Sequence, residues 1–188
     1  MKTNEVFIEQ LRKWNACEGA HKWARKFETF QEAWDKCERP DWMFWLMRKM
    51  INKGCTEEEI IFATCKCARL VLKYVPKGEN RPRIAILTNE YWAKGNASIE
   101  EVIKATNSAY TFITTTKNIS LAAYNAGAAT TMIYRSITNT IDYVLAAAIA
   151  KETEAFAADT AADTFTAGYA VQKAMCRIIR NNIKINLK

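Results

Sequence analysis

The amino-acid sequence predicts an all-α fold, a multi-helix bundle with long Ala-rich helices in its C-terminal part. Apolar residues recur at helical spacing through nearly the whole chain, and strand-like alternation is rare. Six glycines and three prolines among 188 residues leave few positions at which a helix has to end. Two capping-box patterns, Thr56 with Glu59 and Ser98 with Glu101, mark helix starts directly.

The first helices are expected to be short. Val6, Leu11 and Trp14 follow the spacing of an amphipathic helix. We expect Gly19 to kink this helix before a second segment continues to Phe27.

Further helices are predicted in the middle of the chain. Thr29 is suited to cap a short helix. Pro40 suits the first turn of the next helix, which should stop near Gly54. The helix that Thr56 opens is expected to reach Val75.

A helix is also expected between Asn80-Arg81-Pro82-Arg83 and the turn Lys94-Gly95-Asn96. From Ser98 to about Asn181 there is no proline. Two or three long helices are therefore expected there, with breaks near Thr114–Asn118, Asn139 and Ala157–Asp163.

These patterns divide the chain into two parts. Residues 1–97 are rich in tryptophan and cysteine, and residues 98–188 are rich in alanine and threonine. We expect the two parts to pack as one unit, because single helices with such small side chains hide too little apolar surface to stand alone. The small faces around Ala122–Ala150 predict a homodimer in which Asn125 and Asn139 set the register.

The net charge of +7 is unevenly distributed along the chain. Residues 1–97 carry 18 basic and 13 acidic side chains, and residues 98–170 carry 4 and 7. Residues 171–188 carry 5 basic side chains and no acidic one. A cationic surface favours anionic partners such as nucleotides, nucleic acids or acidic protein faces, and the alternative is that the charge serves solubility alone.

The composition also indicates which cellular compartment and which cofactors to expect. No apolar run approaches the roughly 20 residues that span a bilayer, and residues 1–10 show no signal peptide. We therefore expect a cytoplasmic protein without membrane contact, whose six cysteines are free thiols. Cys65 and Cys67 would point about 200° apart on a helix. His21 is the only histidine, so neither a metal site nor a cofactor is expected.

The sharpest candidate for a binding site is Arg81-Pro82-Arg83, at the start of a predicted helix. Free backbone N–H groups and the helix dipole favour anions there, and two arginines can hold a phosphate or carboxylate. Arg69 is a third candidate cation. The alternative for these arginines is structural, in internal ion pairs with carboxylates such as Asp41, Glu79 or Glu90.

Aromatic and basic side chains form two further candidate sets. All six tryptophans precede residue 93, and they serve either as core residues or as stacking surfaces for a base or ring. The candidates for ligand contact are Trp42, Trp45 and Trp92. A basic stripe on the last helix, either a phosphate-binding or a solvated face, is predicted from Lys173, Arg177, Arg180 and Lys184.

The sequence contains no recognisable catalytic set. His21 stands without a catalytic partner, and Asp159 and Asp163 lack a nearby histidine or glutamate. There is no Gly-rich phosphate loop and no serine nucleophile motif. We therefore expect a binding protein rather than an enzyme.

A series of short motifs, in order along most of the chain, matches a known pattern. The first are Trp14-x-Ala16-Cys17-x-x-Ala20-x-x-Trp23, Ala33-Trp34 and Asp41-Trp42-x-x-Trp45-Leu46. The others are Cys65-x-Cys67-Ala68-Arg69, Tyr74-Val75-Pro76, Glu79-Asn80-Arg81-Pro82-Arg83-x-Ala85-Ile86 and Trp92-Ala93-x-Gly95. In these motifs the chain resembles phage and bacterial immunity proteins that have an immunity-protein-5-like domain followed by an Ala-rich helical tail. The resemblance implies a protein that neutralises a toxin or a host defence, and it supplies no catalytic motif.

Three functions are open at the level of the sequence. The first is a phage-type counter-defence protein that sequesters a small anionic, nucleotide-derived signal in a helical pocket. The second is an immunity protein that blocks a toxin or defence enzyme by protein–protein contact. The third is a nucleic-acid-binding protein that uses the basic stripe near the C-terminus.

Overall fold

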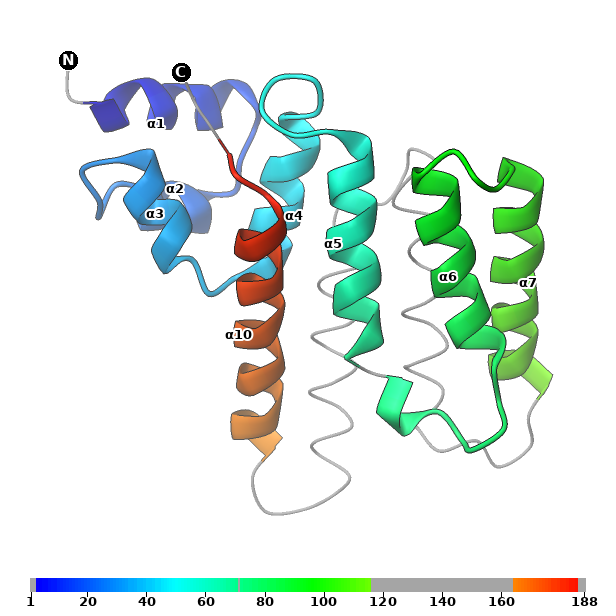
Figure 1. Ribbon diagram of the computed structural model, residues 1–188. Helices are drawn as coiled ribbons and strands as arrows, with labels where there is room; N and C mark the ends of the chain where they lie inside the picture. Colours follow the sequence, from blue (N-terminus) through cyan, green and yellow to red (C-terminus); the bar gives the residue numbers. More distant parts are fainter. Residues whose placement is uncertain (1–2, 71, 116–163, 186–188) are drawn as a thin grey trace.

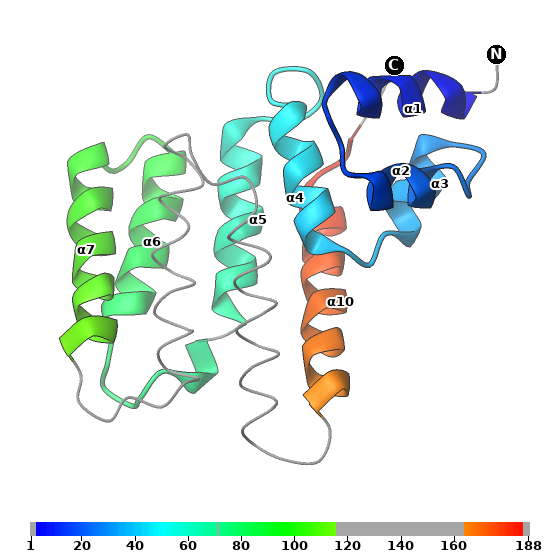
Figure 2. The same ribbon diagram turned by 180° about the vertical axis from the view of Figure 1, so that it is seen from behind.

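The protein is all-α, as predicted. The computed structural model describes residues 3–70, 72–115 and 164–185, and these contain eight α-helices, one short 3-10 helix and no β-strand (Figures 1 and 2). No helix in these ranges is long and apolar enough to cross a bilayer. Some expectations lie outside the described residues: the breaks near Asn139 and Ala157–Asp163, the dimer faces around Ala122–Ala150 with Asn125 and Asn139, and the carboxylates Asp159 and Asp163.

The N-terminal region consists of three short helices, α1 (Thr3–Lys13), α2 (Glu18–Ala24) and α3 (Phe30–Lys36). The chain turns between α1 and α2 at Asn15, whose φ of 57° lies in the left-handed region. The predicted kink at Gly19 is therefore wrong, because Gly19 lies inside α2. A Cβ at Gly19 would come within 3.3 Å of the Trp42 ring, so this glycine allows a close approach rather than a bend.

Helix α4 (Pro40–Lys49) has a proline in its first turn, as predicted, but it ends at Lys49 and not near Gly54. The chain leaves the helix through a turn in which Asn52 adopts a φ of 61°. The Cys55 thiol then donates a hydrogen bond, at 3.1 Å, to the carbonyl oxygen of Met47, which also accepts one from the backbone N–H of Met50 near the helix end.

Helix α5 (Glu57–Arg69) begins with the predicted capping box. The Thr56 hydroxyl accepts a hydrogen bond from the backbone N–H of Glu59 at 3.2 Å, and the Glu59 carboxylate accepts one from the N–H of Thr56 at 2.9 Å. The helix ends at Arg69, short of the predicted Val75, and the 3-10 helix η1 (Leu72–Tyr74) follows it.

The remaining helices are α6 (Arg81–Ala93), α7 (Ile99–Thr115) and α10 (Thr164–Asn182). Gly95 adopts a φ of 73° in the predicted turn between α6 and α7. The second capping box is also present, with hydrogen bonds of 2.7 and 3.2 Å between Ser98 and Glu101.

The largest core cluster joins the two ends of the described chain. Helix α10 lies beside α4 and α5 (Figures 1 and 2). Met175, Cys176 and Ile179 of α10 are fully buried in one cluster with Met43 and Met47 of α4. The last described helix is therefore part of the core that the first half of the chain builds.

Helices α5, α6 and α7 form a row on the other side of α5 from α10 (Figure 1). Ile86 of α6 packs with Cys65 of α5 in one small cluster. Ala85 of α6 packs with Ala105 and Ala109 of α7 in another, where the small side chains allow a close approach of the two helices. Helix α6 thus uses two neighbouring sides for packing.

Candidate functional site

Arg81 lies at the start of α6, where its guanidinium is bound by a carboxylate of the chain itself. Glu79 accepts hydrogen bonds from Arg81 Nε at 2.9 Å, from Nη2 at 2.5 Å and from the backbone N–H at 2.9 Å. The side-chain hydrogen bond with Arg81 is the main cause that lowers the pKa of Glu79. The anion site predicted at this helix start is therefore filled by Glu79, in agreement with the structural alternative.

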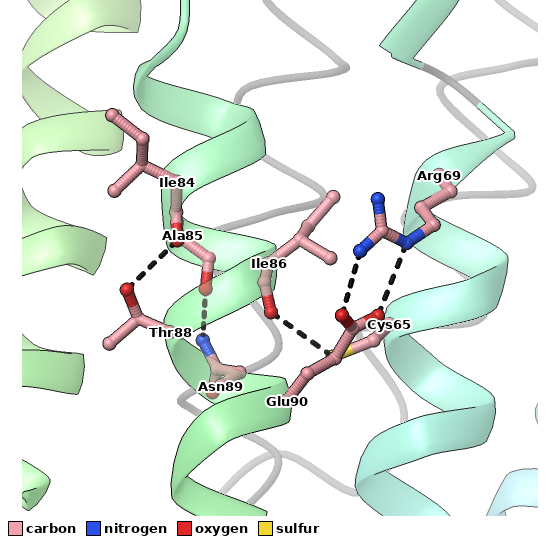
Figure 3. A network of polar contacts seen from close by, with 8 residues as sticks. All are labelled: Cys65, Arg69, Ile84, Ala85, Ile86, Thr88, Asn89 and Glu90. Atoms are coloured by element: carbon pink, nitrogen blue, oxygen red, sulfur yellow. Dashed lines mark hydrogen bonds and ion pairs between the residues drawn. The ribbon is translucent and has the colours of Figure 1, made fainter. Parts of the chain in front are cut away.

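Arg69 is held in the same way, by Glu90. Two hydrogen bonds join the side chains, from Nη2 to Oε2 at 2.7 Å and from Nε to Oε1 at 3.1 Å (Figure 3). Side chains lean toward the N-terminus of their own helix. Helices α5 and α6 are antiparallel, so the side chains of Arg69 and Glu90 lean toward each other. They meet near the hydrogen bond from Cys65 Sγ to the Ile86 carbonyl oxygen. The pair fastens α5 to α6.

The predicted tryptophans lie in two separate places. Trp42 and Trp45 are half-buried on α4 and pack against the main core. Trp92 lies near the end of α6 and packs against the small cluster between α5 and α6. Arg81 and Trp92 are eleven residues apart on one helix, which separates their Cα atoms by about 16 Å along its axis. The structure does not bring the predicted arginines and tryptophans together in one site.

The predicted basic stripe divides into bound and exposed members. Arg180 is half-buried and donates to backbone carbonyls at the end of α3. Lys173 forms an ion pair with Glu38, with 3.3 Å between Nζ and Oε1. Arg177 and Lys184 are exposed, and Lys184 lies beyond the end of α10. A continuous basic face for phosphates is therefore not formed by these four residues.

A feature that sequence reasoning missed is the exposed apolar face of α6. Ile84, Leu87 and Tyr91 are spaced by three and four residues, so they share one helix face. They retain 51, 36 and 53 % of their accessible surface. We call these three residues the α6 stripe. A signal was present in the sequence, because α6 carries apolar residues on all its sides, whereas an ordinary surface helix has one apolar face.

Cations border the α6 stripe. Arg83 is exposed one residue before Ile84, and Lys94 is exposed at the end of α6. The one carboxylate of α6, Glu90, is held by Arg69. Within α6, the exposed charged side chains next to the stripe are therefore cations, and an apolar surface that carries negative charges would complement them.

The described residues offer little for other kinds of site. No group of three or more His, Cys, Asp or Glu side chains among them could hold a metal ion. All six cysteines are free thiols, five of them buried. Comparison with protein-family models, curated proteins and solved structures gives no match to this chain. The resemblance to immunity proteins therefore stays a prediction from the sequence motifs.

Proposed function

We propose that this chain is a non-enzymatic binding protein that neutralises an acidic partner protein by contact at the α6 stripe. The observation that carries the proposal is the exposure of three large apolar side chains on one helix face. Single exposed apolar residues are common on folded proteins, but a contiguous patch indicates an interaction site. Tyr91, and Arg83 next to Ile84, are also residue types that often dominate binding energy at interfaces.

The spacing of the α6 stripe favours a helix as the contacting element of the partner. Ile84, Leu87 and Tyr91 occupy positions that correspond to the seam of two packed helices. Antiparallel pairing of α6 with α6 of a second copy, centred midway between Arg83 and Lys94, would place these two cations beside each other. An acidic amphipathic helix would instead neutralise both cations. The resemblance to immunity proteins suggests that such a helix belongs to a toxin or a defence enzyme.

The other two functions have less support from the geometry. A small anion at the start of α6 would have to displace Glu79 from Arg81, which leaves Arg83 as the exposed cation of that pair. A nucleic acid on α10 would meet a stripe in which Arg180 and Lys173 already have partners.

Site-specific photocross-linking tests the proposal. The chain would carry p-benzoylphenylalanine in place of Leu87, with the same group in place of Ser108, an exposed residue of α7, as a control. We expect one acidic protein to be captured from position 87 and not from position 108, and Ile84→Glu in the same chain should abolish its capture. Equal capture from both positions, or capture that survives Ile84→Glu, would reject the α6 stripe as the interface.

A further inference from the structure

Two cations and one residue of the α6 stripe lie on a single line along α6. Leu87 follows Arg83 by four residues, and Lys94, which directly follows the last residue of the helix, comes seven residues after Leu87. Eleven residues complete about three helical turns, so Arg83 and Lys94 lie on nearly the same side, about 16 Å apart along the axis. Ile84 and Tyr91 form a second line beside the first, and this second line carries no charge.

Both cations are available to a partner. Arg83 and Lys94 are exposed, and neither forms an ion pair within the ranges that the structure describes, in contrast to Arg81, which is bound by Glu79. Lys94 Nζ lies 5.6 Å from the centre of the Phe62 ring on α5, a contact that supplies no anion. The two positive charges therefore stand at the two ends of the line without a carboxylate of the chain bound to them.

Glu90 determines where along this line a partner can carry negative charge. It lies between the cations on the same side of α6, seven residues after Arg83 and four before Lys94. Its carboxylate is bound by Arg69 at 2.7 and 3.1 Å (Figure 3), and α6 has no further cation between its two ends. A partner carboxylate opposite the middle of the line would meet Leu87 and Glu90, and would lose hydration without gaining a cation. The middle therefore favours apolar side chains, and the ends favour carboxylates.

We propose that the α6 stripe selects a helix that carries two carboxylates eleven residues apart on the edge of an apolar seam. This spacing matches the separation of Arg83 and Lys94, and it holds whichever way the partner helix runs. Charges at fixed positions beside an apolar seam determine partner choice and register more than affinity. The inference rests on the proposed function, and it adds a rule for which acidic helices bind: carboxylates clustered at the middle of the seam disfavour the contact.

Fluorescence anisotropy with three labelled synthetic peptides tests this spacing on the full chain. All three are alanine-based helices of one length with the same leucine seam, and circular dichroism checks that their helicity is equal. The first carries two glutamates eleven residues apart beside the seam. The second carries the same two glutamates four residues apart at the middle, and the third has glutamines at the positions of the first. We expect the first peptide to bind roughly fivefold more tightly than either of the others.

Four variants of the protein assign this preference to the two cations. Arg83→Gln and Lys94→Gln should each reduce the preference for the first peptide about twofold, and together they should abolish it. Arg177→Gln is the matched control, because it removes an exposed cation from α10, on the other side of α5, and it should leave the preference unchanged. Leu87→Glu should weaken binding of all three peptides, because it changes the apolar face itself.

The results separate the spacing from the interface. Equal affinity for the first two peptides, lost for both in Leu87→Glu, would overturn the spacing and leave the α6 stripe as the interface. A preference for the first peptide that survives the double replacement of Arg83 and Lys94 would also overturn the spacing. Binding that Leu87→Glu does not weaken would reject the α6 stripe together with the spacing. If no peptide binds at up to about 1 mM, a helix is rejected as the contacting element, and the spacing with it.

Discussion

Arg180 of α10 donates a hydrogen bond from Nη1 to the carbonyl oxygen of Cys37, at 2.8 Å, across 143 positions of the sequence. The same nitrogen lies 3.4 Å from the carbonyl oxygen of Trp34. Both carbonyls belong to the C-terminal end of α3, where a cation interacts favourably with the last carbonyl groups and with the helix dipole. Arg180 thus has a structural role that its place in a basic stripe does not reveal.

Replacing Arg180 by alanine is expected to lower the free energy of unfolding by about 1–2 kcal/mol, because the end of α3 loses a charged donor. Arg177→Ala is the matched control on the same helix, and as an exposed position it should change stability by less than about 0.5 kcal/mol. Urea unfolding followed by circular dichroism measures both. Equal effects of the two substitutions would show that Arg180 does not fasten α10 to α3.

The ion pair of Glu79 with Arg81 predicts a pH dependence of stability. The pKa of Glu79 is lowered in the folded protein, so its contribution is fully present above the unfolded-state pKa of about 4.3. The contribution is lost as the pH falls through the lower folded-state pKa. The difference in free energy of unfolding between the wild type and Glu79→Gln should therefore be largest at neutral pH and shrink in acid. A difference that grows with acidification would contradict the assigned pair.

The cysteines should differ sharply in reactivity. Burial raises the pKa of Cys37 and Cys55 to about 11 and that of Cys176 to about 12, and it raises the pKa of Cys65 and Cys67 as well. Thiolates are the reactive form, so these five groups are expected to be inert in the folded protein.

Cys17 is the one exposed thiol among the six. A thiol-reactive chromogenic reagent should therefore label one group quickly in the native protein and six after unfolding. Cys17→Ser should remove the fast phase and leave five slow groups. Fast labelling of two or more thiols in the folded wild type would show that the core around α4 and α5 opens readily.

Helix starts were predictable from the sequence because their signals are local. The hydroxyl groups of Thr29, Thr56 and Ser98 each cap a helix by accepting a hydrogen bond from the backbone N–H of the residue three positions later. The predicted ends of α4 and α5 lie several residues beyond Lys49 and Arg69, where these helices end in the structure. The first of these ends depends on a left-handed residue, Asn52, which an apolar spacing pattern does not register.

The candidate site was less predictable because it depends on which helices become neighbours. From the sequence, Arg69 could contact either a ligand or an internal carboxylate. Only the packing of α5 against α6 brings Glu90 to it. The α6 stripe was missed for a related reason. A helix that is apolar on all sides does not reveal from its own residues which side, that of Ile86 or that of Leu87, faces the core.

The most direct test of the α6 stripe is calorimetric titration of the partner captured at position 87 into wild-type protein and into Leu87→Glu. Glutamate is a good helix former, and Leu87 is exposed, so the variant should keep the wild-type melting temperature. With an acidic partner we expect the dissociation constant to rise at least about tenfold, which corresponds to roughly 1.4 kcal/mol of lost binding free energy. Ser108→Glu, which adds the same charge on α7, should bind like the wild type. An unchanged affinity of a folded Leu87→Glu variant would contradict the proposed interface.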